Sequence, residues 1–390
     1  MTRSKLPNTT DILIIGGGVM GVSAAYHLAR RKAGRILLLE KQPFLGQGAT
    51  GKCAGGIRHQ FSTEVNIRLS TLSIQMMERF PDEMEQDIDL HFVGYLFLLS
   101  SEEQMDDFRR NVTLQRSLGI ETEILDRDEI ARRAPLINLD AAPAIIGGTN
   151  YHRDGLADPN SIVQGYAKQA RRVGADIRTH TPVRRILRQG DRIIGVETED
   201  GQRIEAGVTL LTAGPWSGKL AATADFDLPV VPLRRQIVVT RPLGIPRDMP
   251  FIIDFAQSLY FHYESGGILT GMSNPHETPG EKEEIDSDWT FHHLEKAIER
   301  FPLLEQAQLL TQWAGLYEVT PDHQAIIGKL PLDGFYTCTG FSGHGFMHGP
   351  VCGLLMAEEI VDGRAVTVNI DPLRYERFLA QELHPEKNVV

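Results

Sequence analysis

A glycine motif near the start of the chain constrains the fold more than any other feature. The apolar run "DILII" (11–15) precedes Gly16, Gly18 and Gly21, which have the spacing G-x-G-x-x-G, and an alanine-rich amphipathic stretch follows. A second apolar run, "RILLLE", ends at Glu40. This order predicts a buried strand, a glycine turn, a helix and a second strand, which is the beginning of a Rossmann-like α/β domain.

The residue types of this motif suit a dinucleotide. Gly16 permits the tight turn, Gly18 lets backbone N–H groups reach a pyrophosphate, and Gly21 lets the helix pack closely on the strand. Glu40 can accept both hydroxyls of an adenosine ribose, and it disfavours the 2′-phosphate of NADP. The chain has no second such motif, whereas flavoenzymes that take electrons from NAD(P)H commonly have two. We therefore predict FAD, reduced by a substrate that binds directly at the flavin.

Length and charge limit the other classes of protein. A chain of 390 residues is long enough for two domains, and its net charge of −11 argues against nucleic acid or an anionic membrane as the main partner. Its three cysteines show no C-x-x-C spacing, as is usual in a reducing compartment. The apolar N-terminal run contains Asp11 and the glycine turn, so we predict neither a signal peptide nor a membrane span. We expect a soluble, cytoplasmic protein without a metal site.

The pattern along the chain predicts two interleaved domains. Helices are expected over 63–80 with Ser62 as N-cap, over 101–118 and from 287, and a three-stranded meander over 183–214. No flexible linker separates these segments. We predict an FAD-binding domain formed by 1–85, 145–220 and 316–390. An α+β substrate-binding domain with an antiparallel sheet would comprise 86–144 and 221–315.

A second glycine-rich loop, "GFSGHGFMHGP" (340–350), lies before the last long helix. Pro350 suits the first turn of that helix. Such a loop leaves backbone N–H groups at a helix N-terminus, where they would stabilise the negative charge of a reduced flavin around N1 and the C2 carbonyl. The alternative is an ordinary strand-to-helix turn.

Taken together, these segments resemble the D-amino-acid oxidase-like (DAO) family of FAD enzymes. The similarity is greatest to the branch of glycine oxidase, sarcosine oxidase and the β-subunits of sarcosine oxidase and dye-linked proline dehydrogenase. It rests on "IIGGGVMGVSAAYHLA", "GATGKCAGGIRHQF", "LLTAGPWS", "LYEVTPDHQAIIG" and "GFSGHGFMHGP". The resemblance implies an FAD that lies extended between two domains.

The resemblance also implies cofactor-binding residues. Gly48, Ala49 and Thr50 would lie along the pyrophosphate and ribityl chain, Val183 would meet the adenine through its backbone, and Ala213, Gly214 and Trp216 would close over the flavin. Gly343, His344, Gly345, Phe346 and Met347 would face the pyrimidine ring of the flavin. Lys41, Cys53 and Gly55 complete the predicted set.

Arg58, in "RHQF", matches the arginine with which sarcosine oxidases clamp the substrate carboxylate. A planar guanidinium binds a carboxylate through two hydrogen bonds and would fix the substrate α-carbon over flavin N5. The alternative is a loop arginine in solvent. Tyr260 and His344 are further catalytic candidates, which would tune the amine or shape the pocket, as would His59, His262 and His348.

Several positions depart from the relatives. Gly315 stands where monomeric sarcosine oxidase attaches its flavin through a cysteine, so we predict noncovalent FAD. Met347 replaces a lysine of the carboxylate clamp, and Tyr317 replaces an arginine of glycine oxidase. Leu269 replaces the lysine that helps oxygen to react. These changes disfavour oxidase activity and favour a dehydrogenase.

The predicted reaction is oxidation of the C–N bond of a small amino acid or N-alkyl amino acid, such as sarcosine, glycine or proline, to an imine. Electrons would pass to O₂ or to a partner redox protein or subunit, in a homo- or hetero-oligomer. Three alternatives stay open. They are the catalytic β-like subunit of a hetero-oligomeric dehydrogenase, an FAD 2-hydroxy-acid dehydrogenase and a non-catalytic flavoprotein that serves assembly.

Overall fold

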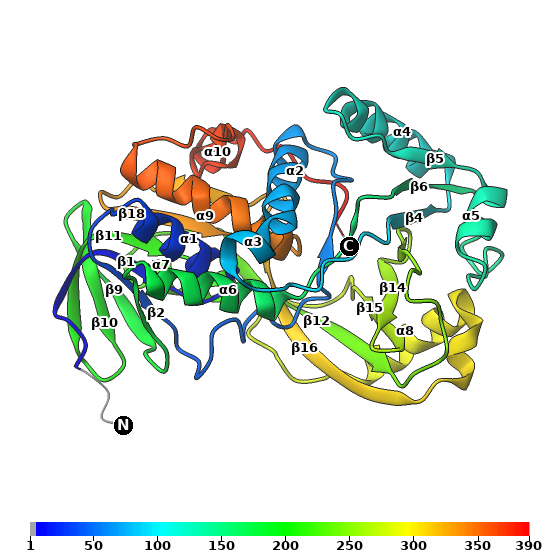
Figure 1. Ribbon diagram of the computed structural model, residues 1–390, viewed down its shortest axis with the longest axis horizontal. Helices are drawn as coiled ribbons and strands as arrows, with labels where there is room; N and C mark the ends of the chain where they lie inside the picture. Colours follow the sequence, from blue (N-terminus) through cyan, green and yellow to red (C-terminus); the bar gives the residue numbers. More distant parts are fainter. Residues whose placement is uncertain (1–4, 390) are drawn as a thin grey trace.

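The computed structural model describes residues 5–389, which form two large sheets with helices against them (Figure 1). The first sheet has a parallel centre, in which β1 pairs with β2 on one side and with β11 on the other. Its strands run in the order β17 (Ile326–Lys329), β18 (Phe335–Thr339), β11 (Arg203–Leu211), β1 (Thr9–Ile15), β2 (Ile36–Leu39) and β8 (Asp176–Arg178), with β10 (Arg192–Thr198) and β9 (Val183–Gln189) continuing from β11. β9, β10 and β11 are the predicted meander.

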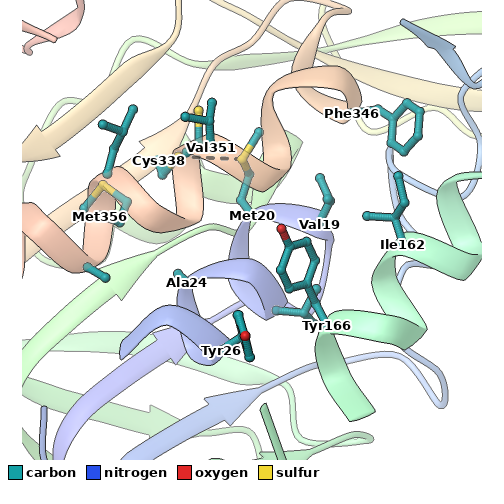
Figure 2. Close-up of a cluster of buried hydrophobic side chains, with 14 of the residues drawn as sticks. Val19, Met20, Ala24, Tyr26, Ile162, Tyr166, Cys338, Phe346, Val351 and Met356 are labelled. Carbon is teal, nitrogen blue, oxygen red and sulfur yellow. Dashed lines mark hydrogen bonds between the residues drawn. The ribbon is translucent and has the colours of Figure 1, made fainter. Parts of the chain in front are cut away.

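The helices α1 (Val19–Arg30), α6 (Pro159–Arg172) and α9 (Gly345–Val361) form the main core beside the first sheet. Figure 2 shows Met20 of α1 close to Val351 of α9, with Tyr166 of α6 on the other side of α1. The close approach of α1 and α9 depends on two glycines of α9. A Cβ atom at Gly349 would lie 2.3 Å from the Val19 side chain, and one at Gly353 would lie 2.1 Å from Ser23 Oγ.

The second sheet is mainly antiparallel, as predicted, with one parallel pair between β13 and β4. Its order is β16 (Leu309–Val319), β12 (Val231–Thr240), β15 (Gly267–Met272), β14 (Leu259–Glu264), β13 (Phe251–Asp254), β4 (Tyr95–Leu99), β6 (Gly147–Tyr151) and β5 (Glu123–Leu125). The short strands β3 (Gly56–Ile57) and β7 (Gly155–Leu156) form a separate pair. The remaining helices are α2 (Glu64–Glu78), α3 (Phe80–Met84), α4 (Glu102–Ser117), α5 (Arg127–Arg133), α7 (Ser217–Ala222), α8 (Ser287–Arg300) and α10 (Glu376–Ala380).

Two details of the helix ends differ from the prediction. Thr63, not Ser62, is the N-cap residue of α2, because the Ser62 hydroxyl donates a hydrogen bond of 2.6 Å to Glu386 instead. Pro350 lies inside α9 rather than in its first turn, because the helix already begins at Gly345. No sequence pattern indicated the contact between Ser62 and Glu386 or the early start of α9.

Two strands of the second sheet extend beyond the residues that were predicted for the substrate-binding domain. β6 belongs to the second sheet, although 145–220 was assigned to the FAD-binding domain, and β16 continues past residue 315 to Val319. The division into two domains stays a proposal. Among residues 5–389, no helix has both the length and the apolar character needed to cross a membrane.

Candidate functional site

A cavity of about 530 Å³, here called the central cavity, is lined by residues from both sheets. At one end lie the glycine turn after β1 and the end of β2, and at the other lie side chains of β12, β14 and β16. The loop 48–58 and the loop before α9 contribute the walls between these ends. The cavity thus combines the two glycine loops and Arg58, which are far apart in the sequence.

The end formed by the glycine turn has the shape expected for a dinucleotide. Gly16 has φ of +111°, and a Cβ atom at Gly21 would lie 1.9 Å from the carbonyl oxygen of Gly16. α1 has no acidic residue in its first turn and no cap from its N-cap residue Gly18. The Val19 amide donates to Thr50 Oγ1 at 3.2 Å, and the other amides of this N-terminus can receive an anion. Gly21 does not itself line the cavity; its role is to let α1 pack against the turn.

Glu40 is held in place by the backbone around it. Its carboxylate accepts hydrogen bonds of 2.7 Å from the amides of Gly17 and Gln42, one on each oxygen. The carboxylate lines the cavity and retains lone pairs for further donors. This arrangement suits the two hydroxyls of a ribose.

The remaining predicted cofactor residues also line the central cavity, and their contacts with a cofactor stay predictions. They are Gly16, Gly18, Lys41, Gly48, Ala49, Thr50, Cys53, Gly55, Val183, Ala213, Gly214, Trp216, Gly343, His344, Gly345, Phe346 and Met347. Burial raises the pKa of the Cys53 thiol to about 12, so this side chain is a neutral neighbour in the wall.

Charged and aromatic groups connect the two sheets over one side of the cavity. The ammonium of Lys41 lies 3.1 Å from the centre of the Trp216 ring, and burial lowers the pKa of Lys41. The Trp216 indole donates a 3.0 Å hydrogen bond to Glu281, which also pairs with Lys219 at 2.8 Å. Sequence reasoning had identified Trp216 and Lys41, and it had missed Glu281.

The loop before α9 contains His344 as the N-cap residue. The imidazole is 2% exposed, and neither ring nitrogen has a hydrogen-bond partner within residues 5–389. Burial, together with His348 and Arg58, holds the pKa of His344 well below 6.5, so the ring is neutral. Because His344 lines the cavity, a bound cofactor or substrate can supply the missing partner.

Glu318 is a site residue that sequence reasoning missed, although it stands in the quoted stretch "LYEVTPD". It lines the cavity under the same loop and accepts a 2.7 Å hydrogen bond from the Thr339 hydroxyl. Burial raises the pKa of this carboxyl, and the hydrogen bond from Thr339 opposes that shift.

At the other end of the cavity, Arg58 is buried, which excludes the alternative of a loop arginine in solvent. Its NH1 group donates a 2.6 Å hydrogen bond to the carbonyl of Gln60, and NH2 donates to the carbonyl of Asn388. The guanidinium also lies 3.9 Å from the centre of the Phe61 ring. Burial lowers the pKa of Arg58, but a guanidinium stays charged in proteins.

A second arginine, Arg235 on β12, lines the same end and was not identified from the sequence. Its NH1 group donates to the Arg234 carbonyl at 3.0 Å, whereas its buried Nε has no acceptor in the described part of the chain. The guanidinium lies 5.0 Å from the centre of the Tyr317 ring. The only available signal was an arginine inside the apolar strand "RQIVVT".

Tyrosines surround these two cations. Tyr95, Tyr260 and Tyr317 line the cavity, and burial raises the pKa of each phenol. The other histidines considered from the sequence do not line it. His59 contacts Asp154 at 2.7 Å, His262 contacts the Tyr263 carbonyl at 2.7 Å, and His348 contacts Ser70 at 2.8 Å. Leu269 likewise lies in the core of the second sheet.

Comparisons with known proteins agree with this geometry. The DAO family, described as "FAD dependent oxidoreductase", matches residues 11–359. FAD-dependent oxidoreductase domain-containing protein 1 of Xenopus laevis is 31% identical over 431 residues, which cover 98% of this chain and 85% of that protein. Human mitochondrial sarcosine dehydrogenase is 30% identical over 92% of this chain, which spans only 40% of that longer protein.

Solved structures give the same result. The L-proline dehydrogenase from P. horikoshii is 30% identical, with a TM-score of 0.88 over 97% of this chain and 100% of that one. The glycine oxidase from Geobacillus kaustophilus, at 24% identity, shares the fold with a TM-score of 0.82 over 94% of this chain and 98% of that one. With a family match over most of its length and a central cavity that fits a dinucleotide, this chain belongs to the DAO family and is an FAD-dependent oxidoreductase.

Proposed function

We propose that this enzyme oxidises the C–N bond of a small amino acid or N-alkyl amino acid to an imine. The observation that carries the proposal is the pair of arginines, Arg58 and Arg235, at the end of the central cavity opposite the dinucleotide turn. Neither guanidinium has a carboxylate partner among residues 5–389. A substrate carboxylate would supply that partner and fix the rest of the substrate. The similar sarcosine and proline dehydrogenases support this substrate class.

FAD would bind without a covalent bond, because by the resemblance Gly315 stands where a relative attaches its flavin through a cysteine, and a glycine has no side chain that could do so. When bound, FAD supplies the acceptor for a hydride. The amino acid would lose that hydride from its α-carbon and a proton from its nitrogen, forming the C=N bond that water then hydrolyses.

The residues of the chain would favour the reactive form of the substrate. Two nearby cations disfavour a protonated amine, so Arg58 and Arg235 would keep the nitrogen lone pair available. Tyr260 and Tyr317 would exclude water from the same end and hold the substrate against the cofactor side of the cavity. The neutral ring of His344 would add no further positive charge.

The test is an anaerobic screen in which purified enzyme is mixed with sarcosine, glycine, proline and 2-hydroxy acids. Bleaching of the flavin absorption by an amino acid is expected, with Arg58→Lys and Arg235→Gln each weakening the apparent affinity by about tenfold or more. Reduction by 2-hydroxy acids alone would indicate a hydroxy-acid dehydrogenase. No reduction by any of them would favour a non-catalytic assembly role.

We further propose that the electrons pass to a partner redox protein or subunit rather than to O₂. By the resemblance, Leu269 stands where a relative has the lysine that helps oxygen to react, and this side chain lies in the core of the second sheet. Peroxide formed in air at the rate of substrate turnover would contradict this assignment. Turnover that requires an added dye would support it.

A further inference from the structure

The C-terminal segment 384–389 reaches the substrate end of the central cavity. It follows α10, and Figure 1 shows the end of the chain between α2 and the second sheet. Gln324 donates a 3.0 Å hydrogen bond to the carbonyl of His384, and the amide of Glu386 donates to the carbonyl of Asp322 at 3.1 Å. Val389 lines the cavity itself. No motif in the sequence indicated that this segment belongs to the site.

Glu386 fixes the segment to the N-terminus of α2. Its carboxylate is 1% exposed and accepts hydrogen bonds from the Ser62 amide at 2.8 Å and the Ser62 hydroxyl at 2.6 Å. It also accepts from Thr63 Oγ1 at 2.8 Å and Asn66 Nδ2 at 3.0 Å. A buried carboxylate with donors on both oxygens at a helix N-terminus has a well-determined position.

Asn388 connects the Glu386 carboxylate to Arg58 through hydrogen bonds. Its amide donates to Glu386 at 3.0 Å, and its side chain donates to the Gln60 carbonyl at 3.1 Å. Asn111 of α4 donates to the Asn388 side chain at 3.1 Å. The carbonyl of Asn388 accepts from NH2 of Arg58, while NH1 donates to the same Gln60 carbonyl.

We infer that Glu386 and Asn388 are positioning residues of the substrate site, which hold the Arg58 guanidinium in the plane that a substrate carboxylate requires. The carbonyls of Gln60 and Asn388 each accept one N–H of the Arg58 guanidinium, from NH1 and NH2 respectively. The remaining N–H donors of Arg58 therefore point in a set direction. A guanidinium that binds a carboxylate loses much of its ability to bind and orient the ligand when it is displaced by about 1 Å. This inference rests on the proposed function, because it assumes a ligand with a carboxylate.

The experiment compares wild-type holoenzyme with Glu386→Ala, Arg58→Lys and the double variant. Acetate binding is measured from the change in flavin absorption, and the apparent substrate affinity and limiting rate from anaerobic reduction. Glu382→Ala is the matched control, because Glu382 is an exposed glutamate shortly before the segment. We expect Glu386→Ala to raise the acetate dissociation constant by about tenfold, with a smaller effect on the limiting rate and none from Glu382→Ala.

The double variant separates positioning from general stability. If Glu386 acts through Arg58, Glu386→Ala will add little to the loss in Arg58→Lys, whereas independent structural damage would multiply the two losses. Multiplied losses, an unchanged acetate affinity in Glu386→Ala or an absence of acetate binding even to the wild-type holoenzyme would each overturn the inference. Asn388→Ala, which keeps Glu386, replaces Glu386→Ala if the latter does not fold.

The acetate measurement also distinguishes failure of this inference from failure of the proposed function. If no amino acid reduces the flavin, the proposed function fails, and the comparison of acetate affinities still decides the role of the segment. If amino acids reduce the flavin and the affinities of wild type and Glu386→Ala are equal, only the positioning role is wrong.

Discussion

Single glycine positions determine the dinucleotide end of the cavity. Gly21 shows this most clearly, because the first turn of α1 passes so close to the turn after β1 that the carbonyl of Gly16 occupies the place of a side chain. Gly16, with φ of +111°, adopts a backbone conformation that other residues rarely take. Both positions were recognised from spacing alone, since the constraint is local.

Gly21→Ala is expected to abolish FAD retention. The new Cβ atom would lie 1.9 Å from the Gly16 carbonyl oxygen and 2.9 Å from Thr212 Oγ1, so the turn must move. The flavin-to-protein absorbance ratio of the purified variant measures the result. Gly280→Ala is the control, because a Cβ atom there meets only the flexible side chain of Lys282 at 3.4 Å or more. Normal flavin content in Gly21→Ala would contradict the assigned role.

At the scale of elements, the contact between α1 and α9 links the N-terminal dinucleotide unit to the C-terminal glycine loop. Gly349 and Gly353 lie on the side of α9 that faces α1, and the Ser23 hydroxyl of α1 donates to the carbonyl of Pro350 at 3.1 Å. Because α9 begins in the cavity wall, its packing on α1 also sets the position of His344 and Phe346.

Gly353→Ala is expected to lower the free energy of unfolding by about 1–3 kcal/mol, because the added methyl group overpacks the contact with Ser23. Urea denaturation followed by circular dichroism measures the change. Val361→Ala, at a half-exposed position at the end of α9, should change stability by less than about 1 kcal/mol. Equal effects of the two substitutions would show that the helix contact is not tightly packed.

At the scale of the whole molecule, several histidines are buried as neutral groups in different parts of the fold. Burial lowers the pKa of His27 and of His348 to about 3 and that of His293 to about 4. In the unfolded chain these groups take up protons near pH 6.5. Their contribution to stability is therefore complete above pH 6.5 and is lost as the pH falls toward the folded-state pKa.

The free energy of unfolding should accordingly decrease by about 1.4 kcal/mol per pH unit for each such histidine below pH 6.5. In His348→Gln, the difference in stability between pH 7 and pH 5 should be smaller than in the wild type by about 2 kcal/mol. Urea denaturation at the two pH values tests this. If the free energy of unfolding changed equally with pH in wild type and variant, His348 would not be buried as a neutral group.

The sequence by itself determined the helices and strands that are specified by neighbouring residues along the chain. The glycine motif, the two apolar runs and the alanine-rich stretch predicted β1, α1 and β2, and turn residues predicted the meander of β9, β10 and β11. These predictions succeeded because neighbours along the chain set the backbone conformation and the buried face. The antiparallel character of the second sheet was also predicted, but the membership of β6 was not.

Only the tertiary structure decided which distant groups meet. Arg58 and Asn388 are 330 positions apart, and Arg235 reaches the same end of the cavity from an otherwise apolar strand. Glu318 and Glu281 likewise became site residues only through folding. No spacing pattern encodes such contacts, because they depend on how two sheets and the last residues of the chain pack together. The glycine spacing and the apolar runs therefore specified the dinucleotide turn. Burial and long-range packing determined which charged groups lie at the other end of the cavity.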